Sequence, residues 1–498
     1  MYKKLLLFTA LFSLSCAGGK KKPLIIVAGR QTPTAIWNNH ELRFDWNTIN
    51  LSDTNFWQNL VKKMPAGMCI GTATSAQQIE GARTHNGFAT SNWTESVKWG
   101  SYYRKHIGPD HWNNYEADAK LHTAIGANAH RMSIAWEKIQ PNGPNSFDQA
   151  AMNHYIADIK AQKAAGIAVW ICLFHFTEPV WFTEAGGFLN ADNIQHFVRF
   201  GDYVMQQLDG LVTHWASFNE PVAYACETYL TGKFPPHYES GLWNSCVWLW
   251  DRVVGFRNAG IATRNMMHAH AALYECAKAI NQHNQFGLIH VFTPLEPYNS
   301  NSSVEQFIAA RMSHMINESI LDIFKTGHFN WLGIVKECMT KQQHTLDWIG
   351  VNYYTHEYIR IAPFSFIFGQ VKAKKGEPTT DALKAIYAEG LYRAIALAST
   401  VNKPMYVTEI GVPVGPKTDR NEWFKKHIYA IAKAYEDGYP VKGIFFWTLM
   451  DSLGWKERKE SKYGLFAVDF NGNSYARDLR YDSKPLVEEF IKPYMKKI

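Results

Sequence analysis

The chain has 498 residues, of which 46% are hydrophobic and 19% charged, and its formal net charge is +7. This composition is that of a globular protein and excludes a disordered chain, a collagen-like repeat and a disulfide-dense scaffold. Lysine and arginine are scattered apart from 20–22 and 456–462, which is typical of a solvated surface and predicts no nucleic-acid partner. No internal apolar run reaches the roughly 18 residues of a membrane span.

The first residues of the chain predict its compartment. Residues 1–15 carry two lysines, then an apolar run of about ten residues and then small residues, which is the plan of a secretory signal. Cys16 follows Leu14 and Ser15, as at a bacterial lipoprotein cleavage site, although Ser13 stands where leucine is usual. We expect an exported protein, secreted, periplasmic or lipid-anchored at the cell envelope, with membrane contact only through a lipid on Cys16. Ordinary signal cleavage and an uncleaved anchor remain the alternatives.

Eight short apolar runs beyond residue 60 have the length of strands. Most are near-continuous rather than alternating, as expected for strands buried on both faces. They lie at 68–72, 127–133, 168–173, 212–218, 285–292, 348–352, 404–408 and 441–446. Helix-like segments lie between them at 118–125, 153–165, 268–280, 383–399 and 422–437, and such repeated strand–helix units imply a parallel sheet.

Eight such units close into a barrel, so the predicted fold class is α/β, a single (β/α)8 TIM barrel with long loops at its C-terminal rim. The barrel domain covers 61–498, after a signal with a basic tether at 1–22 and an N-terminal arm at 23–60. Residues 355–380 are expected to form a structureless loop over one barrel end. The seven cysteines contain no C-x-x-C pair, which gives no support for a zinc or redox centre.

A polar or aromatic side chain of chemical interest accompanies most of these runs. Gln78 follows the first run, Arg131 lies within the second, and His175, the pair Asn219-Glu220, Tyr354, Glu409 and Trp447 follow the third, fourth, sixth, seventh and eighth. The C-terminal ends of barrel strands meet at one rim, where such barrels place their chemistry. We therefore expect these residues to converge.

Glu220 and Glu409 form the most informative pair. Two carboxylates across a barrel mouth can split a glycosidic bond, because one protonates the leaving oxygen while the other attacks or directs water. Their environments must differ so that one stays protonated near neutral pH. Asn219 can donate to a sugar hydroxyl, and Tyr354 can donate to the second carboxylate. The alternative is structural: Glu220 begins a helix before Pro221, and Glu409 caps another.

Longer motifs resemble glycoside hydrolase family 1, the β-glucosidase-type retaining enzymes. The matching stretches occur in family order from about residue 60 to 485. They include GTATSAQQIEGA (71–82), LFHFTEPVWFTEAGGF (173–188), SFNEP (217–221), DWIGVNYYT (347–355), YVTEIG (406–411) and FFWTLMDSLGW (445–455).

The resemblance implies a role for each matching position. Glu220 is expected to be the general acid/base and Glu409 the nucleophile that forms a covalent glycosyl-enzyme, with the carboxyl groups about 5–5.5 Å apart and retention of configuration. Sugar binding is assigned to Gln78, His175, Asn219, Tyr354, Trp447 and Trp455, and Arg131 together with Tyr354 is expected to support the nucleophile. A small carbohydrate or glycoside is the expected substrate, with no metal or organic cofactor.

Three departures from the family pattern bear on specificity. Phe176-Thr177 stands where Trp-Asp is usual, Ile410 replaces the asparagine after the nucleophile, and Gly454 replaces a glutamate that binds the C4 and C6 hydroxyls of glucose. If Gly454 alters specificity, Gly454→Glu should raise activity on a nitrophenyl β-glucoside.

The same departures leave alternative functions open. The 6-phospho-β-glycosidases of the family also lack that glutamate and add serine, lysine and tyrosine for phosphate. Tyr463 matches their tyrosine and Lys462 is one place from their lysine, but Trp455 is retained and no serine stands at 454. A 6-phospho-β-glycosidase, a catalytically impaired sugar-binding barrel and a transglycosylase are therefore the alternatives to a β-glucosidase-like hydrolase.

Overall fold

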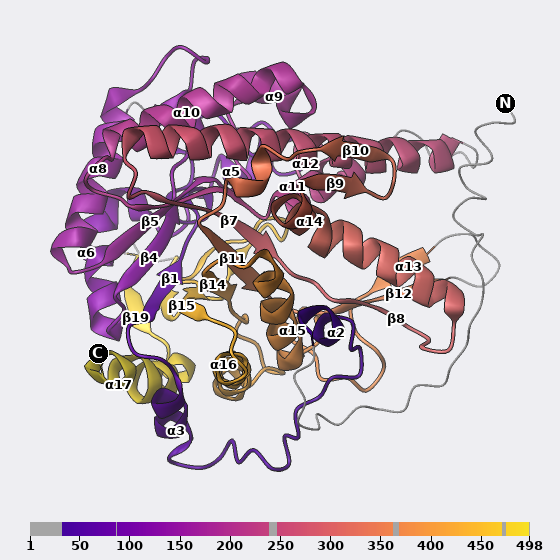
Figure 1. Ribbon diagram of the computed structural model, residues 1–498. Coiled ribbons are helices and arrows are strands. Elements are labelled where there is room, and N and C mark those ends of the chain that lie inside the picture. The colour runs from indigo at the N-terminus through magenta and orange to yellow at the C-terminus, as the bar shows by residue number, and fades with distance from the viewer. Residues whose placement is uncertain (1–31, 86, 239–246, 362–367, 471–474, 498) are drawn as a thin grey trace, which may run out of the picture.

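Eight parallel strands form a closed barrel at the centre of the molecule (Figure 1). The computed structural model describes residues 32–85, 87–238, 247–361, 368–470 and 475–497. The barrel strands are β1 (Cys69–Ala73), β4 (Ala129–Ser133), β5 (Ala168–Phe174), β6 (His214–Asn219), β7 (Gln285–Val291), β11 (Trp348–Tyr353), β14 (Met405–Ile410) and β15 (Val441–Trp447). Their order around the barrel is β1-β15-β14-β11-β7-β6-β5-β4. The TIM-barrel prediction is confirmed, and the eight predicted runs agree with these strands to within two residues at each end.

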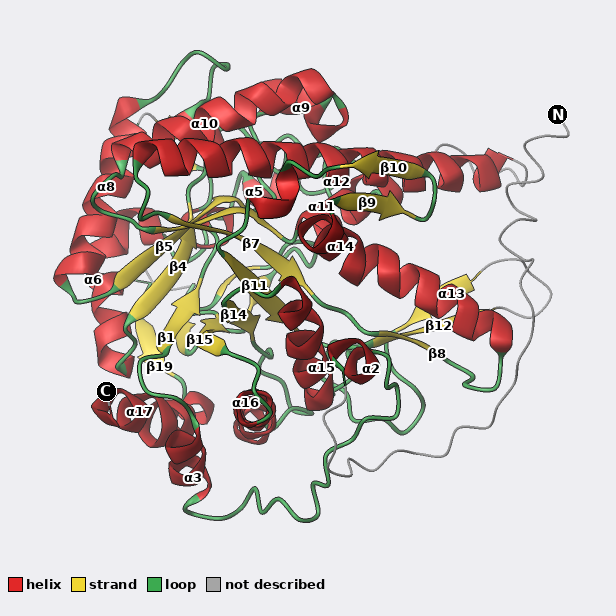
Figure 2. Ribbon diagram, viewed as in Figure 1, coloured by secondary structure: helices red, strands yellow, loops and turns green. Residues whose placement is uncertain are grey.

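Helices surround the barrel (Figure 2). The longer ones are α6 (His111–Ile125), α8 (Gln149–Ala164), α10 (Ile194–Gln207), α12 (Val247–Ile280), α13 (Ser303–Ser313), α15 (Ala388–Ala398) and α16 (Arg420–Glu436). Helix α8 begins after Asp148, whose carboxylate accepts a hydrogen bond from the N–H of Ala151, and α6 ends at Gly126 with φ of 75°, as a C-cap requires.

Shorter elements connect these units. They are the helices α4 (Ala76–Glu80), α5 (Gly100–Tyr103), α7 (Trp136–Ile139), α9 (Val180–Glu184), α11 (Pro221–Ala225), α14 (Ser319–Thr326) and α17 (Lys492–Lys497), and the strands β2 (Arg83–Thr84), β3 (Gly87–Phe88), β9 (His328–Trp331), β10 (Val335–Cys338), β16 (Ser452–Leu453), β17 (Glu460–Ser461), β18 (Phe466–Val468) and β19 (Arg477–Leu479). Among the helices of the described residues, none combines the length and apolarity needed to cross a membrane.

The expectation of a structureless loop at 355–380 is wrong. Strand β12 (Glu357–Ile361) pairs in parallel with β8 (Leu295–Pro297) and antiparallel with β13 (Phe368–Val371), which makes a three-stranded sheet beside the barrel. Because β8 lies some sixty residues upstream of β12, the pairing that creates this sheet has no local sequence signal.

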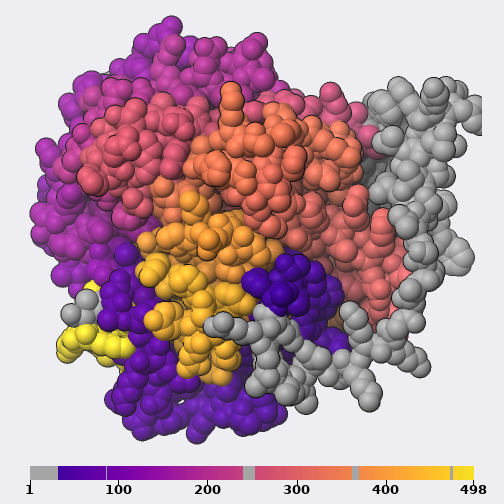
Figure 3. Space-filling model, viewed as in Figure 1, coloured from indigo at the N-terminus to yellow at the C-terminus, as the bar shows by residue number. Residues whose placement is uncertain are grey.

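The segment before the barrel lies against its C-terminal half (Figure 3). It contains α2 (Pro33–Trp37) and α3 (Phe56–Lys63). The Arg393 guanidinium of α15 donates two hydrogen bonds to the Trp37 carbonyl, at 3.0 and 2.6 Å, and Glu389 accepts one from the N–H of Phe44 at 2.9 Å. Residues 1–31, which include Cys16, lie outside the described residues, so export stays a prediction.

Candidate active site

The ends of the barrel strands bring the predicted site residues together at one mouth. Ala73 at the end of β1 is in register with both Arg131 and Trp447, and Asn352 of β11 is in register with Glu409 of β14. The side chains at the mouth are buried: Gln78, Arg131, His175, Asn219, Glu409 and Trp447 are each between 1% and 8% exposed. The predicted convergence is therefore observed, and what it does chemically depends on the contacts.

Glu409 is held between a cation and a phenol. The Arg131 guanidinium forms an ion pair with Oε1 and also reaches the Thr408 carbonyl at 3.3 Å. The Tyr354 hydroxyl donates to Oε2 at 2.5 Å. Each carboxylate oxygen of Glu409 therefore accepts a hydrogen bond, one of them from a cation.

Glu220 lies in a different environment. Burial is the main cause that raises its pKa to about 8, and the charge of Glu409 is the second, whereas a 2.7 Å hydrogen bond from Asn352 Nδ2 to Oε1 opposes both. Its backbone has φ of +50°, an uncommon conformation for a residue with a side chain, between the end of β6 and Pro221. Glu220 therefore favours its protonated form near neutral pH, whereas the two oxygens of Glu409 accept hydrogen bonds from Arg131 and Tyr354.

A hydrogen-bond network connects the two carboxyl groups. Arg131 Nη1 lies 3.3 Å from His175 Nδ1, and His175 Nε2 lies 3.2 Å from Asn219 Nδ2. Asn219 Oδ1 accepts from Asn352 at 3.2 Å, and Thr408 donates to Asn352 Oδ1 at 2.8 Å. Burial and the nearby Arg131 charge lower the pKa of His175 well below its ordinary value, so its ring is neutral.

Asn352 and Thr408 belong to this network. From the sequence, Asn352 is expected at the rim without a role in catalysis or sugar binding, and Thr408 is not predicted at all. The signal for Asn352 was its position at the end of the sixth apolar run, two residues before Tyr354. Thr408 gave no signal beyond its place next to Glu409.

Aromatic side chains form one wall of the mouth. The Trp455 ring faces His175 with centroids 6.1 Å apart and planes at 24°, and it packs on Trp93 at 4.8 Å and Phe176 at 5.4 Å. The centroid of the Trp447 ring lies 5.8 Å from that of the His175 ring. Such rings suit the apolar faces of a sugar.

Gln78 holds this wall in place. Its Nε2 donates to the Leu453 carbonyl at 2.6 Å, and Ser75 donates to its Oε1 at 2.7 Å. The Tyr103 hydroxyl donates to the carbonyl of the next residue, Gly454, at 2.9 Å. The segment that carries Trp455 is thus fixed to the first strand unit of the barrel.

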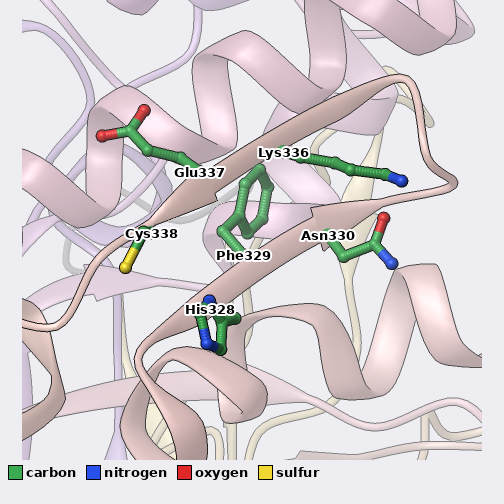
Figure 4. A pocket seen from close by; sticks show the side chains of 6 residues that line it. All are labelled: His328, Phe329, Asn330, Lys336, Glu337 and Cys338. Atoms are coloured by element: carbon green, nitrogen blue, oxygen red, sulfur yellow. The ribbon is translucent and has the colours of Figure 1, made fainter.

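A separate surface hollow of about 330 Å³ lies at the β9–β10 hairpin (Figure 4). It is lined by His328, Phe329, Asn330, Lys336, Glu337 and Cys338. None of these is a mouth residue, so the hollow is not part of the candidate site. Within the described ranges, no group of three or more His, Cys, Asp or Glu side chains is arranged to hold a metal ion.

The family of the chain follows from a comparison with known proteins. The model of glycosyl hydrolase family 1 matches residues 60–493. The chain belongs to glycosyl hydrolase family 1. It is therefore a retaining glycoside hydrolase, and the predicted family, fold and enzyme class are confirmed.

The chain is similar to curated proteins and solved structures of this family. The chain is 29% identical to a 6-phospho-beta-galactosidase of Clostridium acetobutylicum, over 83% of this chain and 94% of the relative. It is 28% identical to one from Lacticaseibacillus casei, over 87% and 99%. Among solved structures, a beta-glycosidase from Pyrococcus horikoshii has a TM-score of 0.72 and 28% identity, covering 87% and 97%. A family 1 b-glucosidase from Thermotoga maritima, with a TM-score of 0.75, 23% identity and coverage of 87% and 98%, shares the fold.

Proposed function

We propose that the chain hydrolyses β-O-glycosidic bonds by double displacement, with Glu220 as general acid/base and Glu409 as nucleophile. The observation that supports these roles is the contrast between the two carboxyl groups: the pKa of the half-buried Glu220 is raised to about 8, and Glu409 is ion-paired with Arg131. In the first step Glu409 attacks the anomeric carbon as Glu220 gives its proton to the leaving oxygen. In the second step Glu220 takes a proton from water, and the water oxygen displaces Glu409 from the sugar.

The change in role of Glu220 follows from its surroundings. While Glu409 is an anion, its charge raises the pKa of Glu220 and favours the proton that the first step needs. Once Glu409 is esterified to the sugar, that charge is gone and the pKa of Glu220 falls, which favours the base that the second step needs.

Covalent labelling tests the assignment directly. A 2-deoxy-2-fluoro glycoside slows the second step, so incubation should leave a sugar adduct on the peptide that contains Glu409, detected by mass spectrometry. Glu409→Gln should form no adduct and lose hydrolysis, and Glu220→Ala should still be labelled by a glycoside with a good leaving group. An adduct on another residue would overturn the nucleophile assignment, and no adduct across several sugar types would favour a sugar-binding barrel.

A 6-phospho-β-glycosidase is the second candidate, because the curated relatives named above carry that activity in their names. Two of the basic residues that follow Trp455, which could bind a phosphate, already have other partners. Lys456 Nζ is ion-paired with Glu227 at 3.3 Å, and Arg458 donates to the Lys98 carbonyl and lies over the Trp99 ring at 5.0 Å. Paired 4-nitrophenyl β-glycosides with and without a 6-phosphate separate the candidates by kcat/KM. Product analysis with added acceptor alcohols separates hydrolysis from transglycosylation.

Export and a lipid on Cys16 are also part of the proposal. They rest on the lysines, the apolar run and the small residues that precede Cys16. Expression with a labelled fatty acid should give a labelled protein in the membrane fraction, and Cys16→Ala should remove the label. An unlabelled wild-type protein would leave ordinary secretion or an intracellular location.

A further inference from the structure

The loop between β16 and β17 forms part of the wall of the mouth. Leu453 pairs with Glu460 in this hairpin, and the N–H of Gly454 donates to the Lys459 carbonyl at 3.0 Å, which closes the loop. Gln78 and Trp455 tie its first strand to the site, through the Leu453 carbonyl and the face of His175. Any side chain held against Gly454 therefore lies next to the sugar-binding end of the mouth.

The side chain held there belongs to Glu457. A Cβ atom placed on Gly454 would lie 2.8 Å from Glu457 Oε2 and 3.4 Å from Glu457 Cβ. The Glu457 side chain thus folds back over Gly454 and fills the space that a side chain at 454 would enter. Its Oε2 accepts a hydrogen bond from the N–H of Lys456 at 2.9 Å, and within the described ranges no cation lies in ion-pair distance of it.

Two tyrosines locate this carboxylate relative to the catalytic groups. Burial is the main cause that raises the pKa of Tyr103 and of Tyr463, and the charge of Glu457 adds to it, after Tyr102 in the case of Tyr103. Tyr103 donates to Gly454, and the Tyr463 ring meets Tyr354 edge-on with centroids 6.3 Å apart. The exposed Glu457 side chain is therefore close to Gly454 and near enough to both tyrosines for its charge to act on them.

We propose that Glu457 is a specificity residue of the sugar subsite: its carboxylate accepts hydrogen bonds from hydroxyl groups of the glycone and disfavours a glycone that carries a phosphate. The inference rests on the proposed function, and it deepens it by naming the substrate class as unphosphorylated β-glycosides. A carboxylate with free lone pairs accepts hydroxyl donors strongly, whereas it repels a phosphate dianion at the same distance.

The position of Glu457 also changes the expectation for Gly454→Glu. The sequence suggested that a glutamate at 454 would raise activity on a glucoside. The structure shows that its Cβ would meet the Glu457 carboxylate, so the single substitution places two like charges in one space. We expect no gain from Gly454→Glu alone, and a gain from Gly454→Glu in a Glu457→Ala background, where the carboxylate is supplied from the other position.

The first test compares Glu457→Ala and Glu457→Gln with Glu460→Gln, a matched control on the same hairpin. The substrates are the 4-nitrophenyl β-glucoside and β-galactoside, each with and without a 6-phosphate, and the β-xyloside, which lacks the hydroxymethyl group. Glu457→Ala should lower kcat/KM for the preferred unphosphorylated hexoside about tenfold to a hundredfold, the value of one charged hydrogen bond, chiefly through KM. The ratio of phosphorylated to unphosphorylated turnover should rise in Glu457→Gln, and Glu460→Gln should behave as wild type.

The outcomes distinguish this inference from the proposed function. If the wild type turns over and forms an adduct on Glu409, but the Glu457 variants have the same kcat/KM values as Glu460→Gln, the role of Glu457 is overturned and the mechanism stands. The same would follow if the wild type preferred a 6-phospho glycone. Recovery of activity in the double variant Gly454→Glu/Glu457→Ala, relative to Glu457→Ala, would support a shared carboxylate position, because a merely structural role of Glu457 would not be rescued there.

Discussion

The pKa of Glu220 should respond strongly when the charge of Glu409 is removed. Glu409→Gln keeps the shape of the side chain and removes the charge, leaving burial as the main cause of the raised value. Two unit charges about 5.5 Å apart, the spacing of a retaining pair, interact by roughly 3 kcal/mol at an effective dielectric constant of about 20. Since one pKa unit is about 1.4 kcal/mol, the pKa of Glu220 should fall by about two units. From a starting value of about 8, it should reach about 6 and remain above 4.5 because the site is still buried.

The assay is a pH titration of 13C-labelled glutamate carboxyl signals by NMR, with Glu220 assigned through Glu220→Gln. Wild type, Glu409→Gln and the glycosyl-enzyme formed with a 2-deoxy-2-fluoro sugar are compared, because esterification also neutralises Glu409. The matched control is Glu178→Gln, which removes another buried carboxyl whose own pKa is raised to about 7 and which is not among the causes of the Glu220 shift. An unchanged Glu220 titration in Glu409→Gln would show that burial alone sets its pKa, and the electrostatic account of its two roles would be refuted.

Three other predictions follow from the same contacts. Tyr354→Phe removes a 2.5 Å hydrogen bond to Glu409, so kcat/KM should fall about tenfold to a hundredfold, as measured by steady-state kinetics on a nitrophenyl glycoside. Lys384→Met removes a cation that lies 5.4 Å from the Tyr354 ring and lowers the pKa of Glu220, so the basic limb of the pH profile should move to higher pH, with an unmoved limb contradicting the assignment. In the unfolded chain the Glu220 carboxyl ionises above pH 4.5, whereas in the folded protein it ionises only near pH 8. The free energy of unfolding therefore falls as the pH rises from 4.5 to 8. Glu220→Gln should therefore stabilise the protein more at pH 8 than at pH 4, by up to roughly 4 kcal/mol of unfolding free energy, and melting temperatures at the two pH values measure this difference. Equal gains at both pH values would contradict the raised pKa.

The barrel could be predicted because its signal is local. Each barrel strand is a short, largely apolar run, most of these runs are followed by a polar or aromatic group of the site, and strands such as Trp348–Tyr353 are buried along their whole length. The sheet made by β8, β12 and β13 could not, since Glu357–Ile361 is short and its parallel partner is distant in the sequence. Tertiary pairing decided that segment, which by itself reads as a loop.

The site shows the same division between local and non-local information. Glu220 and Glu409 could be found because each directly follows a strand of a parallel barrel, which fixes the mouth to which it belongs. The contacts that set their chemistry depend on side-chain positions: Asn352 donates to Glu220 while its Oδ1 accepts a hydrogen bond from Thr408. Likewise, Gly454 looks like an empty position until the hairpin turn brings Glu457 back over it.

The features that suit Glu220 to catalysis all oppose folding. The Glu220 side chain is half-buried, its carboxyl is near the charge of Glu409, and its backbone has φ of +50°. These costs are tolerated because the closed barrel fixes β6, β11 and β14 independently of the mouth, through ladders on both sides of each strand. The network from Arg131 through His175 and Asn219 to Asn352 connects the two carboxyl groups, and the charge of Glu409 acts directly on the pKa of Glu220. The barrel thus supplies the stability, and the mouth uses part of it to hold Glu220 with a raised pKa opposite a Glu409 that is paired with Arg131.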